Sequence, residues 1–361
     1  MSIIIETARG ILYFMRKHIH RAYRKVCDTS PQLKRKIRIA YATLLGIAIL
    51  SGAVIVMVAE IQLKRLEEAA RIPEAPPFPI SVNPQLKTIF ENPEVDTYFA
   101  IYVSSDYSRN KKISWLDKTF EKIAISNWFQ QLASPVARVL VIYPGERKEE
   151  IAEEFGDILR WSEEEESHFM ALVDQSLPEL TEGVYFPGRY LTHKDATPEE
   201  VASLVTTEFN DQLLKRYPEE LAAQIPLSQA LIIASLLERE AYDFTDMREI
   251  SGIIWNRLFI DMNLQLDATL QYAKAEKTPG VWWPQIVPKD KYIESPFNTY
   301  ENEGLPPAPI ANPSLDAVLA ALNPIETDCM FYFHDDNSNF HCSATYEEHV
   351  SLLKERYGQG R

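Results

Sequence analysis

The feature that most constrains this chain is a run of 21 residues, at 39–59, that contains no charged side chain. A helix of about 20 apolar residues is long enough to span the hydrocarbon core of a bilayer. The run is longer than the apolar part of a usual signal peptide, and no good small-residue cleavage site follows it. We therefore expect a single transmembrane helix at 39–59, with a buried helix of a soluble domain as the alternative.

Charges are distributed unevenly around this run. Residues 1–38 hold 10 of the 37 lysines and arginines but only two of the 52 acids. Basic residues that flank a span stay in the cytoplasm, so we expect a basic cytoplasmic segment at 1–38 and an extracytoplasmic position for everything after the span, at the inner (cytoplasmic) membrane. The sequence leaves open whether 1–38 lies on the lipid surface as an amphipathic helix or is a disordered tail.

The remainder of the chain is strongly acidic. Residues 60–361 carry 27 bases against 50 acids. Such a surface would repel the phosphates of DNA or RNA, so we expect no nucleic-acid partner. No cysteine and histidine spacing typical of a metal site occurs, and we expect neither a metal nor a cofactor.

Beyond the span the sequence predicts an α+β protein in three pieces. Residues 60–92 contain five prolines between 73 and 84, which is typical of a semi-rigid linker. Residues 93–210 mix strand and helix patterns and predict an α/β region, in which Thr197 and Glu200 form a capping box at the start of a helix. Residues 211–361 predict a mainly helical domain with a small β-hairpin near its end.

Two of the three cysteines, Cys329 and Cys342, flank that predicted hairpin. A turn at 335–338 would place them roughly opposite each other, where a cross-strand disulfide can form in an oxidising compartment. Two buried free thiols are an equal alternative.

The helix predicted at 229–241 carries the residues that suggest chemistry. It is apolar on every side up to Leu237 and then ends in Glu238, Arg239 and Glu240. Desolvation, a second like charge and the negative end of the helix dipole all raise the pKa of a carboxyl placed there. A carboxyl that keeps its proton near neutral pH is what a general acid requires. The alternative is the wetted end of a core helix, with Glu240 in a salt bridge.

The two glutamates should differ in role. Each residue turns a helix by about 100°, so Glu238 lies about 160° away from Glu240 around the axis. Glu240 shares the face of Leu236 and Leu237, which are its neighbours three and four positions earlier.

Five motifs around this helix keep one order along the chain. They are Ala-Ser-Leu-Leu-Glu-Arg-Glu at 234–240, Asn-Arg-Leu at 256–258 followed by Asp-Met-Asn-Leu-Gln-Leu-Asp-Ala-Thr at 261–269, Ser-Pro-Phe-Asn-Thr-Tyr at 295–300, Gly-Leu-Pro-Pro-Ala-Pro-Ile-Ala-Asn-Pro at 304–313 and Thr-Tyr-Glu-Glu-His at 345–349. In this set the chain resembles the bacterial endolytic lytic transglycosylases of the MltG (YceG-like) family. Residues 138–209 look similar to the LysM-like region of that family. The chain departs from the family pattern at four loop positions, none of which is in the acidic pair: Asp261, Ala268, Phe297 and Ala308.

The resemblance implies an enzyme that cleaves the β-1,4 bond between MurNAc and GlcNAc of peptidoglycan without water and leaves a 1,6-anhydro-MurNAc end, terminating or trimming nascent glycan strands. It implies Glu240 as the catalytic acid and base, with Glu238 as the second choice. It also implies four candidates for binding the sugars: Gln265, Asp267, Asn298 and Tyr300. The alternative role of these side chains is to make hydrogen bonds that hold the loops in shape. Trp282 and Trp283 would either stack on sugar rings or pack inside the protein.

The implied partners are peptidoglycan glycan strands, the membrane through residues 39–59, and cell-wall synthases.

Two other functions remain open from the sequence. One is a hydrolase of the same polymer, which would need a carboxylate to activate water. The other is a non-catalytic, membrane-anchored protein that binds the cell wall or acts as a scaffold.

Overall fold

The computed structural model describes residues 76–98 and 136–358, apart from positions 96, 179, 181 and 279, and four single positions nearer the N-terminus, 35, 39, 42 and 43. The predicted basic segment and transmembrane helix therefore lie almost wholly outside the described residues. Within the described ranges, no helix is long and apolar enough to cross a membrane. The chain divides into two compact units, Met1–Glu74 and Ala75–Arg361, and the second unit is the one described below.

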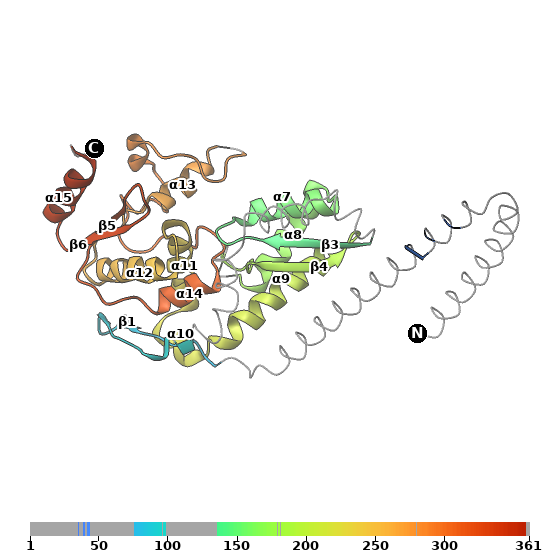
Figure 1. Cartoon of the computed structure of the whole chain (residues 1–361), viewed down its shortest axis with the longest axis horizontal. Helices are drawn as coiled ribbons and strands as arrows, with labels where there is room; N and C mark the ends of the chain where they lie inside the picture. The colour runs from blue at the N-terminus through green and yellow to red at the C-terminus, as the bar shows by residue number, and fades with distance from the viewer. Residues whose placement is uncertain are drawn as a thin grey trace, which may run out of the picture. The chain divides into compact units, whose positions relative to one another are not determined.

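This unit is α+β, as the sequence predicts, and its sheets are small (Figure 1). Strands β3 (Ala137–Ile142) and β4 (Gly188–His193) pair antiparallel, and two helices, α7 (Lys148–Leu159) and α8 (Glu163–Ser176), connect them. Helix α9 (Pro198–Gln212) follows and packs on β4 and α8. Together these elements form an α/β part.

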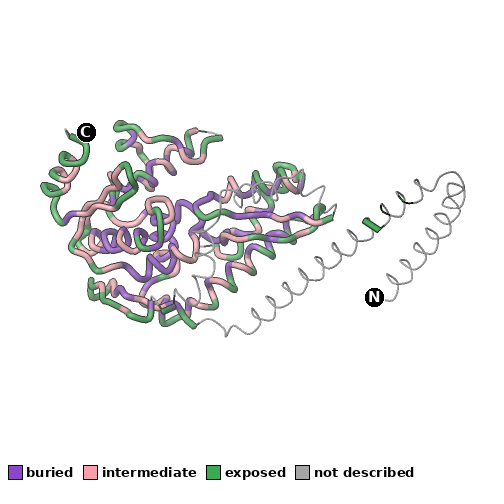
Figure 2. The backbone as a smooth tube through the Cα atoms, in the orientation of Figure 1, coloured by how far each residue is buried: buried purple, intermediate pink, exposed green. Residues whose placement is uncertain are grey.

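The second part is mainly helical, and α11 (Leu227–Glu240) lies at its centre. Every residue of α11 from 230 to 237 is buried. A helix without a polar side needs neighbours all round, and α12 (Phe244–Phe259), α13 (Asp267–Ala275) and α14 (Leu315–Leu322) supply them. Figure 2 shows buried backbone concentrated in this region.

Shorter elements complete the described chain. Strands β1 (Val82–Asn83) and β2 (Thr88–Ile89) form a small hairpin within the predicted linker. Helix α10 (Glu219–Gln224) and two 3-10 turns, Leu214–Arg216 and Pro288–Tyr292, lie in the connections. Strands β5 (Phe331–His334) and β6 (Phe340–Ser343) and helix α15 (Tyr346–Tyr357) end the unit.

Side-chain caps mark the starts of several helices, among them α9 and α12. The Thr197 side chain accepts from the Glu200 backbone, which is the predicted capping box of α9. The sequence pattern places the next long helix at about 246–259 with Thr245 as its cap, but the structure begins α12 at Phe244. Asp243 is the cap, because its carboxylate accepts from two backbone N–H groups of the first turn.

Asn312 joins the α/β part to the helical part. Its amide donates to Glu182 Oε1 at 2.6 Å and to the backbone oxygen of Glu146 at 3.0 Å. Its side-chain oxygen accepts from the backbone N–H groups of Gly183 and Tyr185, each at 3.0 Å. Burial raises the pKa of Glu182 to about 8. The side chain of Asn312 is fully buried and so acts as a fixed connector.

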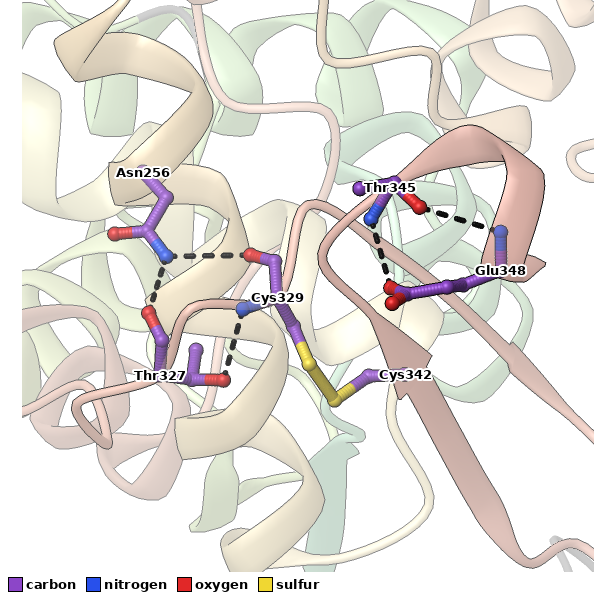
Figure 3. The surroundings of a disulfide bond; sticks show 6 residues. All are labelled: Asn256, Thr327, Cys329, Cys342, Thr345 and Glu348. Carbon is purple, nitrogen blue, oxygen red and sulfur yellow. Dashed lines mark hydrogen bonds between the residues drawn. A yellow bond between two sulfur atoms is a disulfide. The ribbon is translucent and has the colours of Figure 1, made fainter.

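The predicted hairpin carries the disulfide. Cys329 and Cys342 are bonded, with their Cα atoms 5.8 Å apart (Figure 3), so the interpretation as two free thiols is wrong. The expectation that the two residues face each other was inaccurate, because the strand ladder pairs Cys342 with Tyr332. The disulfide therefore crosses the hairpin diagonally.

Gly252 allows α12 to approach the segment that leads into β5. A Cβ at this position would lie 2.3 Å from the backbone oxygen of Ile325 and 3.0 Å from Thr327 Cγ2. One turn later, the Asn256 amide donates to the backbone oxygens of Thr327, at 2.7 Å, and of Cys329, at 3.2 Å. Close packing at Gly252 thus determines where the hairpin begins.

Gly252→Ala should lower the free energy of unfolding by about 1–3 kcal/mol, because the added methyl group meets backbone that must move. Gly156→Ala is the matched control: it also lies inside a helix, but the atoms nearest to its Cβ would belong to the flexible side chain of Glu166 and not to backbone. The control should be neutral or stabilising by up to about 1 kcal/mol, since alanine favours helix. Denaturant unfolding of both variants measures this, and equal losses would contradict the packing argument.

Candidate active site

Glu240 is the last residue of α11, and its carboxylate is held by two neutral donors. Oε1 accepts from the backbone N–H of Ala268 at 3.3 Å, and Oε2 accepts from the Tyr332 hydroxyl at 2.9 Å. Ala268 lies in the first turn of α13, and Tyr332 lies on β5. The residue as a whole is half-buried. Glu240 forms no salt bridge with any described residue. Its partners among these residues are therefore not the charged ones that the alternative interpretation, a salt-bridged Glu240, requires.

Burial is the main reason that the pKa of Glu240 is raised above the usual value. The hydrogen bonds from Tyr332 and Ala268 lower it, the negative charge of Asp267 raises it, and His334 lowers it. Desolvation was predicted from the sequence. The nearby like charge is Asp267 on α13, whereas the sequence pattern suggested Glu238. The net effect is a carboxyl that holds its proton to higher pH than an ordinary glutamic acid.

Glu238 points to a different neighbour, as the helical spacing predicts. Its Oε2 accepts from Ser314 twice, from the backbone N–H at 2.9 Å and from the hydroxyl at 2.6 Å. Ser314 is the N-cap of α14. Burial raises the pKa of Glu238 too, and the two Ser314 hydrogen bonds lower it. Glu238 thus ties the end of α11 to the start of α14.

Three of the four predicted sugar-binding residues lie on two adjoining segments: Gln265 just before α13, Asp267 at its first position, and Tyr300 on the loop at 295–300. The Tyr300 hydroxyl donates to Asp267 Oδ1 at 2.7 Å, and the backbone N–H of Gln265 donates to the Thr299 oxygen at 3.0 Å. Gln265 and Asp267 are exposed and Tyr300 is half-buried. Gln265 has a φ of 53°, a left-handed conformation that residues other than glycine rarely adopt and that clusters at functional sites.

Asn298 is different, because it is fully buried. Its amide donates to the backbone oxygens of Lys291 and Ile293 at 3.0 and 2.9 Å, and its side-chain oxygen accepts from the Tyr300 N–H at 2.9 Å. These are the loop-fixing contacts that the sequence left as the alternative. Asn298 therefore shapes the loop that carries Tyr300.

The two tryptophans each lie against an arginine. The guanidinium of Arg239 is 3.8 Å from the ring centre of Trp283, which also packs against the core. Arg147, from the α/β part, lies 4.2 Å from the Tyr272 ring and 5.8 Å from the Trp282 ring. Both rings are half-buried. Trp283 packs against the core, whereas the ring of Trp282 lies beside Arg147.

Two residues of β5 near Glu240 were missed by sequence reasoning. Tyr332 donates to Glu240, and His334 Nε2 lies 2.8 Å from Asp246 Oδ2. The rings of Tyr332 and His334 lie 6.1 Å apart. Alternate residues of a strand share a face, so the sequence does show that Tyr332 and His334 lie on the same side of β5. Nothing local in the sequence shows that β5 packs against the end of α11.

Arg257 connects the two segments that contact Glu240. Its Nε donates to the Met330 oxygen at 2.7 Å, at the start of the hairpin, and its Nη1 donates to the backbone oxygens of Leu264 and of Asn263, the latter at 3.2 Å. The loop at 263–264 leads directly to Ala268. One buried guanidinium thus fixes both donors of the Glu240 carboxyl relative to each other.

No group of three or more His, Cys, Asp or Glu side chains within the described ranges is placed to hold a metal ion. A surface cavity of about 380 Å³ lies away from Glu240, and its lining comes from residues 90–93, Arg248 and residues 324–326.

Comparisons with known proteins show the family of this chain. The family model described as the YceG-like family matches residues 117–355. An endolytic murein transglycosylase of Bacillus subtilis (strain 168) is 33% identical over 177 residues, which are 49% of this chain and 48% of that protein. An endolytic murein transglycosylase of Streptococcus pneumoniae serotype 2 is 31% identical over 154 residues, which are 43% of this chain and 28% of that protein. This chain spans about half the length of these relatives, or less.

A solved structure is also similar. The crystal structure of a YceG-like protein from Listeria monocytogenes is 29% identical in sequence and aligns with a TM-score of 0.50. The alignment covers 59% of this chain and 75% of that one.

The free energy of unfolding of Glu240→Gln, measured relative to that of the wild type, should increase as pH rises from about 4 to 7. A carboxyl whose folded-state pKa is raised contributes stability that is complete below its unfolded pKa and is lost as pH rises through the folded pKa. The neutral amide avoids that loss, so we expect the free energy of unfolding of the variant to exceed that of the wild type at pH 7 and to differ little from it at pH 4. Thermal unfolding across this pH range measures it, with exposed Glu303→Gln as the control that should show no such trend.

Proposed function

Because this chain belongs to the YceG-like family, we propose that it is an endolytic peptidoglycan lytic transglycosylase in which Glu240 is both catalytic acid and base. The observation that carries the proposal is the environment of the Glu240 carboxyl. Burial raises its pKa, and its partners are neutral donors that leave it free to gain and lose a proton. A salt-bridged carboxylate would be a poor acid near neutral pH.

The reaction needs only one such group. Protonated Glu240 gives its proton to the glycosidic oxygen while the C1–O4 bond between MurNAc and GlcNAc breaks, and C1 acquires oxocarbenium character. The Glu240 carboxylate then accepts the proton of the MurNAc 6-hydroxyl, whose oxygen attacks C1. The products are a GlcNAc 4-hydroxyl and a 1,6-anhydro-MurNAc end, and no water is consumed.

The loops beside Glu240 supply the polar groups for the sugar. Gln265, Asp267 and Tyr300 are proposed to bind hydroxyl or N-acetyl groups. All three are at least partly exposed; Asp267 and Tyr300 interact electrostatically with Glu240, and Gln265 precedes Ala268, which donates to it, by three residues. Trp282 is proposed as a stacking surface. We assign Asn298 to holding the loop, since its side chain has no access to substrate.

Asp267 favours a second candidate function, hydrolysis of the same bond. It is an exposed carboxylate near Glu240, and a hydrolase would need such a group to activate water. In the transglycosylase proposal Asp267 instead holds the Tyr300 hydroxyl. The masses of the products separate the two, because an anhydro end lacks the water that hydrolysis adds.

We further propose that the α/β part is a LysM-like module within residues 93–210 that binds glycan. Its strand–helix–helix–strand order, with β3 and β4 paired antiparallel, supports this assignment. We also propose that residues 39–59 anchor the chain in the cell membrane, and that the catalytic part acts outside the cytoplasm on strands made by neighbouring synthases. The support is the uncharged run and the basic residues that precede it.

Digestion of purified glycan strands by the full chain in detergent should give 1,6-anhydro-MurNAc ends. Glu240→Gln should lower kcat by about 10²–10⁴-fold, the usual contribution of a general acid or base. Glu238→Gln should lower kcat by less than about tenfold, since the role of Glu238 is to hold Ser314. Mass spectrometry of the products checks the reaction; water-containing ends would indicate a hydrolase, and an unaffected Glu240→Gln enzyme would rule out the assignment.

The topology is tested with spheroplasts, whose cytoplasmic membrane is still closed. Protease added to spheroplasts should degrade the part described from residue 76 onwards and leave a small membrane-bound fragment that contains residues 1–59. Replacing the basic residues 34–36 and 38 by acids should reduce that degradation, because the orientation signal is removed. Full protection of the wild-type chain would contradict the proposed orientation.

A further inference from the structure

We propose that Tyr332 is the positioning residue for the catalytic acid and that the Cys329–Cys342 disulfide keeps it in place. The proposal deepens the function proposed above and rests on it, because it concerns the same carboxyl. It is carried by the contact at Glu240, by the register of the hairpin and by the anchoring of the hairpin on α12.

The contact places a hydroxyl on one oxygen of the acid. Tyr332 donates to Oε2 at 2.9 Å while the Ala268 N–H occupies Oε1. The backbone N–H can only donate, but a hydroxyl donates to a carboxylate and, after rotation about its C–O bond, accepts from a carboxylic acid. Tyr332 is therefore able to hold Glu240 in both protonation states through which the proposed reaction passes.

The hairpin register shows how Tyr332 is placed. Tyr332 is paired with Cys342 on the neighbouring strand. Cys342 is bonded to Cys329 (Figure 3), which lies three residues before Tyr332. The covalent bond thus closes around the short stretch of chain that presents the tyrosine. A two-stranded hairpin is marginally stable on its own. The disulfide therefore restricts movement of β5 relative to β6 that the hydrogen bonds between the strands would allow.

The start of the hairpin is anchored on α12 as well. Asn256 donates to the backbone oxygen of Cys329, and Arg257 donates to that of Met330. Arg257 also holds the loop that leads to Ala268. Both donors to Glu240 are consequently fixed from one turn of one helix, and the disulfide extends that order along β5 to Tyr332.

The electrostatic surroundings of Glu240 come from every element packed against its side chain. Asp267 lies on α13, Tyr332 and His334 lie on β5, Tyr300 lies on the loop at 295–300, and Arg239 lies on α11 itself. Among them, Tyr332 is the one whose side chain donates a hydrogen bond to the carboxyl. Removing that donor should raise the pKa of Glu240, because the hydrogen bond favours the carboxylate.

The test compares the wild type with Tyr332→Phe in the full chain. Phenylalanine keeps the ring contacts with Phe340 and His334 and removes only the hydroxyl. Tyr217→Phe is the matched control, since it removes a buried hydroxyl that donates to the Ile225 oxygen at 2.7 Å, away from Glu240. The readouts are the pH–rate profile on glycan strands and the titration of the Glu240 carboxyl carbon by NMR, assigned through its loss in Glu240→Gln.

Tyr332→Phe should move the alkaline limb of kcat to higher pH, lower kcat by about tenfold and leave KM nearly unchanged. The control should change none of these. The limb moves in that direction because activity falls where the acid loses its proton, and the variant retains the proton to higher pH. An unchanged NMR titration in Tyr332→Phe would overturn the proposal.

The disulfide is tested in two ways. Cys329→Ser combined with Cys342→Ser should reproduce part of the Tyr332→Phe effect, and adding Tyr332→Phe to that pair should have less effect than in the wild type, because the two changes act on one contact. Reduction of the folded wild type by dithiothreitol, which gives two thiols and the cyclic disulfide of the reagent, should do the same without any substitution. Additive effects, or an unaffected NMR titration after reduction, would overturn the role of the disulfide.

The two proposals fail separately. A wild-type chain that forms no anhydro ends would refute the transglycosylase assignment, whereas the NMR titration would still decide whether Tyr332 controls the Glu240 carboxyl.

Discussion

The burial of α11 on all sides is the constraint on which the rest of the structure depends. A helix with no polar face must be surrounded, and α12, α13 and α14 surround it. Its two glutamates emerge where that apolar environment ends. Each must find donors in the surrounding elements, because a buried carboxylate without partners is very costly. Glu238 finds the cap of α14, and Glu240 finds the first turn of α13 and a tyrosine of β5.

The same constraint explains why the two carboxyls differ in use. Glu238 has two donors from one residue and serves as a connection between helices. Glu240 has one donor on each oxygen, from two segments that Arg257 holds in register. Neither donor carries a charge that would fix the carboxylate state. A group held in position yet able to change its proton is the requirement for general acid and base catalysis.

Local patterns predicted the parts of the fold that local interactions determine. The capping box at Thr197, the hairpin and the opposite faces of Glu238 and Glu240 are confirmed, and the helix predicted at 229–241 is α11, Leu227–Glu240, buried on all sides up to Leu237. The family resemblance drawn from the motifs is confirmed as well. The sequence pattern places the start of α12 two residues too late, because Thr245 is also a possible cap, whereas in the structure Asp243 accepts from the first turn.

The contacts of the site depended on long-range packing and were harder to predict. Asn298 has the polar side chain of a sugar-binding residue, and only the folded loop shows that its groups are already occupied. Tyr332 is 92 residues from Glu240, so no spacing rule joins them. Asn312 stands in a recognisable motif, yet its role as the connector to the α/β part appears only once Glu182 and Glu146 are in place.

The most direct test of the account is a crystal structure of the Glu240→Gln chain with a bound glycan strand. The account predicts that the new amide lies within about 2.6–3.2 Å of the glycosidic oxygen between MurNAc and GlcNAc, with the MurNAc 6-hydroxyl on the same side. A strand bound with its glycosidic oxygen out of reach of residue 240 would contradict it.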